Sequence, residues 1–273
     1  MPNPLFDLSG RVVLVTGGNS GIGLGMAEGL ARAGADVAIW GVKPERNREA
    51  VERLEATGRQ IHSEICDVAQ EAEVERAMDS TLARLGRLDA CFANAGVSGR
   101  AGPQTSFMDI TTSEWRRVMD VNLDGVFFTL RAAARLMVRQ GTGGSLVATG
   151  SAFGTMGQPL VEHYAAAKAG VESMMRSLAV ELGRHGIRAN TIVPGYIETV
   201  ANHKMINSQA FMAEHLHRVA LGRWGKPEDF AGIAVYLASE ASAYVTGASF
   251  VIDGALTIAA KVTQKGTSGG TWG

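Results

Sequence analysis

Short runs of β-branched and other apolar residues alternate with longer helical patterns along this chain. The apolar runs predict strands, and the stretches between them predict helices. Strands separated by helices pair in parallel through right-handed crossovers, and helices then cover both faces of the sheet. The predicted fold class is therefore α/β, a single-domain, doubly wound parallel sheet. The predicted strands are RVVLVT (11–16), DVAIW (36–40), IHSEICDV (61–68), LDACFANAG (88–96), SLVATGS (145–151), IRANTIVPG (187–195) and ASFVIDG (248–254).

The helical stretches follow one another without a linker-like break, so residues 1–260 are interpreted as one domain. Residues 197–226 combine scattered polar side chains with no strong strand pattern, which indicates a substrate loop or lid within that domain. Residues 261–273 are rich in Gly, Ser and Thr and are predicted to form a flexible tail. The predicted helices cover residues 21–34, a charged stretch that begins at Pro44, and residues 70–85, 113–140 and 162–185.

The composition is that of a folded protein without an electrostatic preference for a charged partner. Of the 273 residues, 46% are hydrophobic and 19% are charged, which argues against disorder. The formal net charge is −1 and no basic stripe is present, which disfavours nucleic-acid binding. No apolar run reaches the roughly 18 residues that a membrane span requires, and the first residues lack the pattern of a signal peptide. We therefore expect a soluble, cytoplasmic protein with neither nucleic-acid nor membrane partners.

The cysteines and histidines do not have the spacing of metal ligands. Cys66 and Cys91 follow apolar runs and are interpreted as buried thiols in a reducing compartment, although counting alone leaves a disulfide open. His215 and His217 are two residues apart and diverge by about 200° on a helix, which makes a poor metal pair. His163 is expected to point about 100° away from the side chain that follows it, and all three histidines are interpreted as surface residues or residues behind the site. No metal site is predicted.

A glycine-rich turn, TGGNSGIG (16–23), follows the first predicted strand. Glycines in such a turn let the backbone approach a pyrophosphate, and the helix that follows presents its first amides to the negative charge. The alternative is a tight turn that only packs a helix closely against the sheet. The strand–turn–helix context favours dinucleotide binding and a Rossmann-type sheet. The chain has no GxxxxGK[ST] pattern, which disfavours phosphoryl transfer.

Tyr164 and Lys168 are four residues apart in VEHYAAAK (161–168), so they share one face of a predicted helix. A tyrosine titrates near pH ~10 in water and is a poor acid–base catalyst at neutral pH. An ammonium ~4 Å away, at an effective dielectric constant of ~20, favours the phenolate by roughly 4 kcal/mol. This would lower the pKa of Tyr164 by about three units at most, because desolvation acts in the opposite direction. The alternative is an amphipathic helix that carries both residues without a chemical role.

The combination of TGxxxGxG with YxxxK resembles the short-chain dehydrogenase/reductase family. The resemblance covers about residues 8–257. Further segments match in order: Asp67 in CDV, the NAG motif Asn94-Ala95-Gly96, Asn122 in VMDVNLDG, Ser151 thirteen residues before Tyr164, and Pro194-Gly195 followed by Ile197 and Thr199.

The resemblance implies a catalytic set of Asn122, Ser151, Tyr164 and Lys168, which interconverts a ketone and a secondary alcohol by hydride transfer with NAD or NADP. Tyr164 acts as general acid or base, and Ser151 holds the reacting oxygen. Lys168 lowers the pKa of the tyrosine and binds the nicotinamide ribose, and Asn122 bends its helix and holds a water. The implied cofactor-binding residues are Gly17, Asn19, Ser20, Gly21, Ile22, Gly23, Gly41, Lys43, Asp67, Val68, Asn94, Ala95, Gly96, Tyr164, Lys168, Pro194, Gly195, Ile197 and Thr199.

The end of the second strand determines which dinucleotide a Rossmann fold selects: a carboxylate binds the ribose hydroxyl of NAD, and a cation accommodates the phosphate of NADP. Gly41 stands where the family has the acid, and Val42 where NADP enzymes often carry Arg. Ser20 is not the Lys or Arg that some NADP enzymes place in the glycine loop. Because Lys43 and Arg46 lie near and no acid repels a phosphate, the interpretation leans to NADP. The alternative is that both cations are solvated residues at the start of a surface helix.

The predicted substrate contacts are mostly apolar with a few polar groups, a mixture that fits many ketones and alcohols. Arg100 either pairs with a substrate anion or is a solvated loop residue. The contacts are Ser151, Phe153, Gln158, Tyr164 and Tyr196, with Ser98, Met156, Leu160 and the loop after Thr199 nearby.

The resemblance points to 3-oxoacyl-carrier-protein reductases and to sugar or polyol dehydrogenases. Val180 stands where carrier-protein reductases usually have Arg, which weakens the first assignment. A non-catalytic cofactor-sensing regulator is the alternative from another class, and such proteins typically lose the Tyr or the Lys. The helices around 113–140 and 162–185 correspond to dimer-forming helices of the family, so a homo-oligomer, tetramer or dimer, is expected from resemblance.

Overall fold

The computed structural model describes residues 4–97, 106–202, 207–208 and 215–259. The predicted C-terminal tail, 261–273, therefore lies outside the described residues. So do Ser98, Arg100 and part of the predicted substrate loop, residues 203–206 and 209–214.

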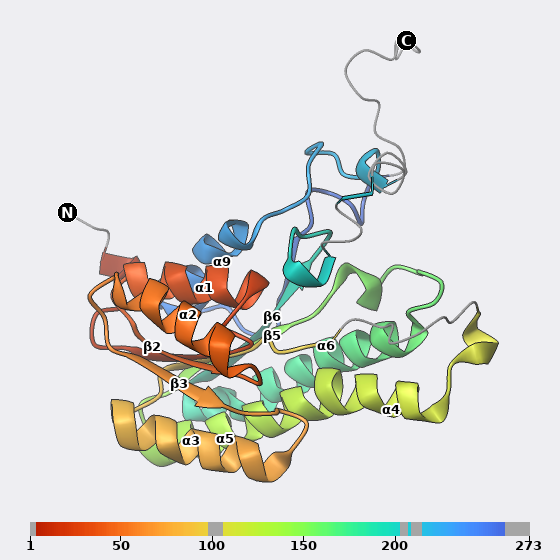
Figure 1. Cartoon of the computed structure of the whole chain (residues 1–273). Coiled ribbons are helices and arrows are strands. Elements are labelled where there is room, and N and C mark those ends of the chain that lie inside the picture. The colour runs from red at the N-terminus through yellow and green to blue at the C-terminus, as the bar shows by residue number, and fades with distance from the viewer. Residues whose placement is uncertain (1–3, 98–105, 203–206, 209–214, 260–273) are drawn as a thin grey trace.

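Seven parallel strands form one sheet in the order β3-β2-β1-β4-β5-β6-β7 (Figure 1). The order changes direction between β1 and β4, where the chain crosses from one half of the sheet to the other. Each neighbouring pair is parallel, which confirms the predicted fold class. The strands are β1 (Val12–Thr16), β2 (Asp36–Gly41), β3 (Ile61–Ile65), β4 (Ala90–Ala93), β5 (Gly144–Thr149), β6 (Ile187–Pro194) and β7 (Ser249–Ile252).

Helices cover both faces of this sheet (Figure 1). On one face lie α1 (Gly21–Arg32), α2 (Pro44–Glu55) and α9 (Ala231–Ala238). On the other lie α3 (Glu71–Leu85), α4 (Thr112–Met119), α5 (Gly125–Gln140) and α6 (Glu162–Leu182).

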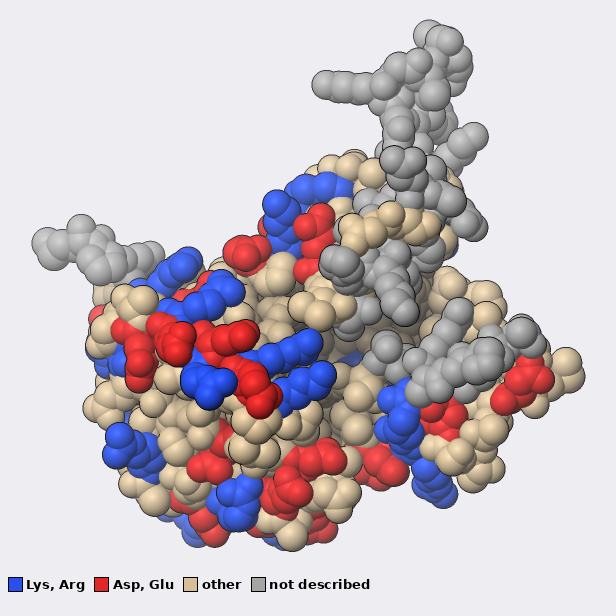
Figure 2. Space-filling view, in the orientation of Figure 1, with Lys and Arg blue, Asp and Glu red and all other residues tan. Residues whose placement is uncertain are grey.

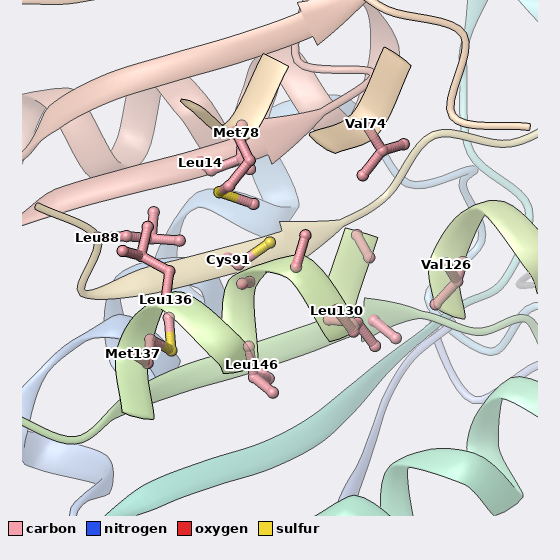
Figure 3. Packing of buried hydrophobic residues seen from close by; sticks show 14 of the residues in the cluster. Leu14, Val74, Met78, Leu88, Cys91, Val126, Leu130, Leu136, Met137 and Leu146 are labelled. Carbon is pink, nitrogen blue, oxygen red and sulfur yellow. The ribbon is translucent and has the colours of Figure 1, made fainter. Parts of the chain in front are cut away.

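The inner strands β1, β2, β4, β5 and β6 are buried on both sides, as their near-continuous apolar sequences require, whereas the edge strands β3 and β7 are partly exposed. Along β1 the side chains alternate between two cores: Val13 and Val15 pack beneath α1 and α9, and Leu14 faces α3 and α5. Figure 3 shows the second core, where Leu14 and Cys91 of the sheet meet helix side chains such as Met78, Leu130 and Leu136. Both cysteines are buried and free, as predicted.

Two helical regions differ from the sequence prediction. The helix predicted over 113–140 is two helices, α4 and α5, joined by a π-helical turn, Asp120–Asp124. The helix α9, which follows a 3₁₀ turn at Pro227–Phe230, was not predicted. Its sequence, AGIAVYLA, is apolar on all sides and lacks the polar face that identifies a surface helix.

Two glycines of α1 let α9 pack closely against that helix. A Cβ atom at Gly29 would lie 2.6 Å from the Ala231 side chain, and one at Gly25 would lie 2.1 Å from the Pro227 carbonyl oxygen. Only a residue without a side chain fits at either position. The glycines of α1 therefore serve two purposes. Those within the helix allow α9 to pack closely, and those at its start form the turn described below.

The surface carries no single-sign patch on the face shown in Figure 2, where Lys and Arg are interspersed with Asp and Glu. This agrees with the formal net charge of −1. Within the described part of the chain, no helix has the length and apolarity needed to span a membrane.

Candidate active site

The glycine-rich turn joins the end of β1 to the start of α1 at the point where the strand order changes direction. Gly17 and Gly21 have positive φ angles of 64° and 52°, a conformation that favours glycine. A Cβ atom at Gly23 would lie 2.3 Å from the Gly17 carbonyl oxygen and 2.5 Å from Asn94 Nδ2. Ser20 precedes α1, and its hydroxyl caps no amide among the described residues. The first amides of α1 are therefore positioned to receive an anion.

A chain of hydrogen bonds joins the carboxyl ends of β1, β4 and β5 to α6. The Thr16 hydroxyl accepts from the backbone amides of Asn94 and Ala95, each at 3.0 Å. The Asn94 side chain donates to the Thr16 carbonyl at 3.1 Å and accepts from the Thr149 hydroxyl at 3.0 Å. Lys168 Nζ donates to the Thr149 carbonyl at 2.7 Å. Residues predicted for cofactor binding and for catalysis thus belong to one network.

Lys168 is a buried lysine. Only 3% of it is exposed, and burial lowers the pKa of its ammonium to about 8. Its Nζ lies 5.6 Å from the centroid of the Tyr164 ring, so the two residues share one face of α6, as predicted. The hydrogen bond to the Thr149 carbonyl fixes the ammonium at the carboxyl edge of the sheet.

Tyr164 lies beside Ser151, which follows β5. Burial raises the pKa of Tyr164, and a hydrogen bond with the Ser151 side chain acts in the opposite direction to a smaller extent. This corrects the prediction that Lys168 lowers the pKa of Tyr164 towards neutrality, because here desolvation outweighs the stabilisation of the phenolate. Tyr164 is therefore a protonated phenol at neutral pH in this structure.

Asn122 lies in the π-helical turn and joins it to the loop after β4. Its Nδ2 donates to the carbonyls of Val118, at 2.9 Å, and Val97, at 3.1 Å, and its Oδ1 accepts from the Val97 amide at 3.3 Å. A Cβ atom at Gly96 would lie 2.7 Å from Asn122 Oδ1 and 3.7 Å from Lys168 Nζ. Asn122, Gly96 and Lys168 are therefore in close proximity, and the irregular helix turn agrees with the expected bend.

Three buried polar residues behind the site were not assigned to it from the sequence. Glu172 follows Lys168 by one helical turn, and one of its oxygens accepts from the Ser249 hydroxyl at 3.1 Å. His163, which was interpreted as a surface residue or one behind the site, is fully buried. Its Nε2 lies 3.7 Å from Glu114 Oε1, and Glu114 accepts two hydrogen bonds from Arg117, each at 2.7 Å. Burial of such groups depends on tertiary packing, which sequence spacing does not reveal.

Thr16 and Thr149 were also missed as site residues. Each ends a run of apolar residues and directly precedes a glycine, in VLVTGG and LVATGS. A hydroxyl at the last position of a buried strand is the one signal in the sequence that could have identified them.

The cofactor residues predicted at the ends of β2 and β3 lie at the same edge. Gly41 is the last residue of β2 and is buried, and Lys43 is exposed just before α2. Asp67 Oδ1 accepts from the Ala69 amide at 3.0 Å. Val68 is buried and lies so close to α5 that a Cβ atom at Gly125 would be 2.8 Å from its side chain.

The segment after β6 runs beside the glycine turn. A Cβ atom at Gly21 would lie 3.2 Å from the Thr199 methyl group, and one at Gly195 would lie 2.7 Å from Asp253 Cβ. Ile197 forms a bridge with Gly225, so the predicted substrate loop, 197–226, begins and ends at adjacent points.

Aromatic side chains form a wall beside Ser151. Tyr196 stacks on Trp224, with ring centroids 5.1 Å apart, and meets Phe153 edge-on at 6.0 Å. Phe153 is two residues from Ser151, and its amide donates to the Ser151 hydroxyl at 3.2 Å. Gln158 is partly exposed in the loop that leads from β5 to α6. The predicted contacts Ser151, Phe153 and Tyr196 therefore lie together.

These residues fit a dinucleotide. The glycine turn leaves no space for side chains at Gly17 and Gly23, the first amides of α1 are not capped by Ser20, and a polar network leads from this turn to Lys168. Among the described residues, no three His, Cys, Asp or Glu side chains gather to hold a metal ion. The fold and the site define a dinucleotide-binding α/β enzyme.

Comparison with known proteins defines the family. Residues 17–257 match the family described as enoyl-(acyl carrier protein) reductase. The chain is 40% identical over 252 residues to an L-rhamnose 1-dehydrogenase (NAD(P)(+)) of Sphingomonas sp. (strain SKA58), which covers 92% of this chain and 98% of that protein.

Two crystal structures share the fold over nearly their whole length. A short-chain type dehydrogenase/reductase from Mycobacterium marinum has a TM-score of 0.88 and 37% identity, covering 93% of this chain and 98% of that one. A gluconate 5-dehydrogenase from Burkholderia cenocepacia J2315, in complex with NADP and tartrate, has a TM-score of 0.87 and 35% identity, with the same coverage. This chain belongs to the short-chain dehydrogenase/reductase family and is an NAD(P)-dependent oxidoreductase acting on CH–OH groups.

Proposed function

We propose that this enzyme interconverts a hydroxyl group of a sugar or sugar acid and the corresponding carbonyl, with Tyr164 as the general acid or base. The observation that carries the proposal is the convergence of Ser151, Tyr164 and Lys168 beside an aromatic wall at the carboxyl edge of the sheet. The bound nicotinamide supplies the acceptor or donor of hydride.

Ser151 and Tyr164 act on the reacting oxygen. The Ser151 hydroxyl holds that oxygen in place and stabilises the charge that develops on it. Tyr164, a protonated phenol at neutral pH, donates its proton to a carbonyl oxygen during reduction. In oxidation the phenolate removes the proton of the alcohol. Because burial raises the pKa of Tyr164, we expect oxidation to accelerate as the pH rises above neutrality.

Lys168 and Asn122 act behind the tyrosine. Lys168 remains mostly protonated at neutral pH, and its position at the Thr149 carbonyl leaves it next to Gly96 and the Tyr164 ring. There it stabilises the phenolate and donates to the ribose hydroxyls of the cofactor. Asn122 holds the π-helical turn and the loop after β4 in register, which keeps the floor of the site in place.

The names of the relatives and the shape of the wall support a carbohydrate substrate. Two of the three relatives reported above are named for L-rhamnose and gluconate. Flat aromatic surfaces such as Phe153 and Tyr196, with a few polar groups, are suited to the ring or chain of a sugar. Val180 is 86% exposed on α6 and offers no charge to an acidic carrier protein, so a 3-oxoacyl-carrier-protein reductase is the weaker candidate.

A substrate panel tests the proposal. The purified enzyme is incubated with NAD⁺ or NADP⁺ and with L-rhamnose, gluconate, other aldoses and sugar acids, simple alcohols and a 3-hydroxyacyl thioester, while nicotinamide absorbance is followed. We expect turnover with members of the sugar group that exceeds turnover with the other compounds. Preference for the thioester would overturn the assignment to sugars. Full activity in Tyr164→Phe would overturn the role of Tyr164.

We also propose that the enzyme is a homo-oligomer, a dimer or tetramer. Val251, on β7, is 50% exposed at the edge of the sheet, and Phe127 and Val180 expose 41% and 86% on α5 and α6. An open strand edge and apolar residues on long helices are surfaces that a second copy can cover. Light scattering after size exclusion tests this, and a monomer at micromolar concentration would contradict it.

A further inference from the structure

The end of β2 carries no side chain, and the space beside it is filled. Gly41 stands where a Rossmann fold usually places the residue that reads the adenosine ribose. A Cβ atom at Gly41 would lie 2.2 Å from Asn19 Nδ2 and 2.7 Å from Asn47 Oδ1. Both distances are far shorter than carbon makes with nitrogen or oxygen without a covalent bond. Two asparagine amides therefore occupy the place that a side chain at position 41 would need.

The orientation of the Asn47 amide is fixed by the sheet. Asn47 lies on α2 and is 4% exposed. Its Nδ2 donates to the Gly41 carbonyl at 3.2 Å and to the Glu64 carbonyl at 3.0 Å, on adjacent strands. Because two carbonyls require the nitrogen, Asn47 Oδ1 must face the other way, where it accepts from Asn19 Nδ2 at 2.7 Å.

Asn19 is thereby held at the edge of the glycine turn. It is partly exposed. Of the two hydrogens on its Nδ2, one is donated to Asn47 Oδ1. No described residue makes a hydrogen bond to Asn19 Oδ1. The side chain thus presents one acceptor and one remaining donor, in a fixed direction, where α1 and β2 approach each other.

We propose that this Asn19–Asn47 pair reads the 2′ position of the adenosine ribose, in place of a side chain at position 41. The inference rests on the proposed nicotinamide chemistry. A neutral amide can accept from the ribose hydroxyl of NAD and can donate to the phosphate of NADP, so it rejects neither. The exposed Lys43 adds a solvent-screened attraction for the phosphate. One neutral hydrogen bond contributes about 0.5–1.5 kcal/mol, so the two cofactors should differ in affinity by about tenfold or less.

The pair also determines what an engineered acid at position 41 can do. In Gly41→Asp the new side chain collides with the Asn19 amide, which must leave its place. Removing that amide, in Asn19→Ala with Gly41→Asp, relieves the 2.2 Å contact and leaves the 2.7 Å approach to Asn47 Oδ1, so the carboxylate can face the ribose hydroxyl after a small shift of Asn47. A 2′-phosphate would then meet a like charge at close range, which disfavours NADP.

The test is a fluorescence titration of NADH and NADPH binding to five proteins: wild type, Asn19→Ala, Gly41→Asp, the double variant and Val42→Asp. Val42 is 58% exposed, so its Asp variant adds the same charge one residue further along the chain, where the side chain faces solvent. Circular dichroism melting confirms that each variant is folded.

We expect about tenfold or less between the cofactors in wild type, and about a threefold to tenfold loss of NADH affinity in Asn19→Ala. Gly41→Asp should lower the affinity for both cofactors by about tenfold or more, because the displaced amide disturbs the glycine turn. The double variant should bind NADH at least about tenfold more tightly than NADPH, by the same electrostatic reasoning. Val42→Asp should leave the NADH affinity within about threefold of wild type, since exposed charges interact weakly.

A shift towards NADH in Gly41→Asp that equals the shift in the double variant would overturn the inference, because the amide would not be obstructing the acid. Unchanged affinity in Asn19→Ala would overturn it as well, and this variant adds no atoms and so tests the pair even if Gly41→Asp does not fold. Wild-type protein that binds neither nucleotide would instead contradict the proposed function, from which the inference follows.

Discussion

The two halves of the sheet's carboxyl edge present different kinds of chemical group. After β1, β2 and β4 the chain presents glycines, uncharged amides and backbone groups, as in the turn at Gly17–Gly23 and the Asn19–Asn47 pair. After β5 and on α6 it presents buried or partly buried ionisable side chains: Lys168, Glu172 and Tyr164, of which Tyr164 is hydrogen-bonded to Ser151. In the function proposed above, the first half receives the cofactor and the second half moves the proton.

The difference has a thermodynamic side. Glycines in close contact and satisfied amides are compatible with a stable fold, whereas a buried ammonium and a buried carboxylate lower the free energy of unfolding unless they are well paired. A change in the first half should therefore affect cofactor affinity, and a change in the second should affect catalysis and stability in opposite directions. The following variants test this division, from the largest expected effect to the smallest.

Removing one hydroxyl from the second half should have the largest effect. We expect Tyr164→Phe to lower kcat by about a thousandfold or more, because proton transfer loses its donor, with NADPH affinity within about twofold of wild type. Steady-state kinetics and cofactor titration measure the two quantities. The matched control is Tyr244→Phe, since Tyr244 is fully exposed and should behave as wild type. A large loss of cofactor affinity in Tyr164→Phe would break the division between the halves.

Adding one methyl group to the first half should have the next largest effect. In Gly23→Ala the new carbon would lie 2.3 Å from the Gly17 carbonyl oxygen, so the turn must open. We expect cofactor affinity to fall by about a hundredfold, the loss of roughly 3 kcal/mol. The control is Gly232→Ala in α9, where a Cβ atom would have no other atom within 4 Å. In this variant the free energy of unfolding should rise by about 0.5–1 kcal/mol. Equal affinity in the two variants would show that the close packing of the turn is unimportant.

The buried ammonium should reveal itself through pH. Burial lowers the pKa of Lys168 from 10.5 to about 8, so the folded chain releases a proton that the unfolded chain keeps between these values. Below pH 8 the cost of burial is present in full, at about 3 kcal/mol, and it disappears as the pH rises towards 10.5. Lys168→Met should therefore abolish activity and yet stabilise the fold at pH 7. Removing the burial cost adds about 3 kcal/mol to the free energy of unfolding, and losing the hydrogen bond to Thr149 subtracts about 1 kcal/mol, which leaves a gain of about 2 kcal/mol.

Urea denaturation of wild type, Lys168→Met and the exposed-lysine control Lys43→Met tests this over a range of pH. The advantage of Lys168→Met should shrink as the pH approaches 10.5, and Lys43→Met should stay within about 0.5 kcal/mol of wild type throughout. A destabilised Lys168→Met at pH 7 would mean that the ammonium holds the fold together.

The smallest effect is expected at His163. Neither of its ring nitrogens has a hydrogen-bond partner among the described residues, and Glu114 keeps Arg117 if the imidazole is removed. His163→Leu should therefore change the free energy of unfolding by less than about 1 kcal/mol. Urea denaturation measures this. A loss of more than about 3 kcal/mol would indicate a charged imidazole paired with Glu114.

The parts of the site that could be predicted from sequence depend on local geometry. The spacing of Tyr164 and Lys168 places both on one face of a helix in any α/β fold, and the strand–glycine–helix context of residues 16–23 sets the dinucleotide turn. The sheet followed from buried apolar runs, which end within a few residues of the predicted boundaries. Each of these features is determined by neighbours in the chain.

The parts that escaped prediction depend on contacts between distant segments. The π-helical turn at Asp120–Asp124 does not interrupt the helical pattern of the sequence. The helix α9 is apolar on more than one side because Ala234 and Leu237 lie in the core while Ala231 packs against Gly29 of α1. The pKa of Tyr164 was predicted with the wrong sign because burial, which raises it, depends on how deep the phenol lies and outweighs the hydrogen bond with Ser151. The orientation of the Asn47 amide depends on two carbonyls from adjacent strands.

The hydrogen-bond chain from Thr16 through Asn94 and Thr149 to Lys168 also determines when the site can exist during folding. Its members lie at the carboxyl ends of three strands and on one helix, which are far apart in the sequence. An N-terminal fragment that ends before β5 contains the glycine turn and the Thr16–Asn94 hydrogen bond, but it lacks Thr149 and Lys168. We therefore expect dinucleotide affinity and proton transfer to emerge together and late, once β5 and α6 have docked onto the earlier strands.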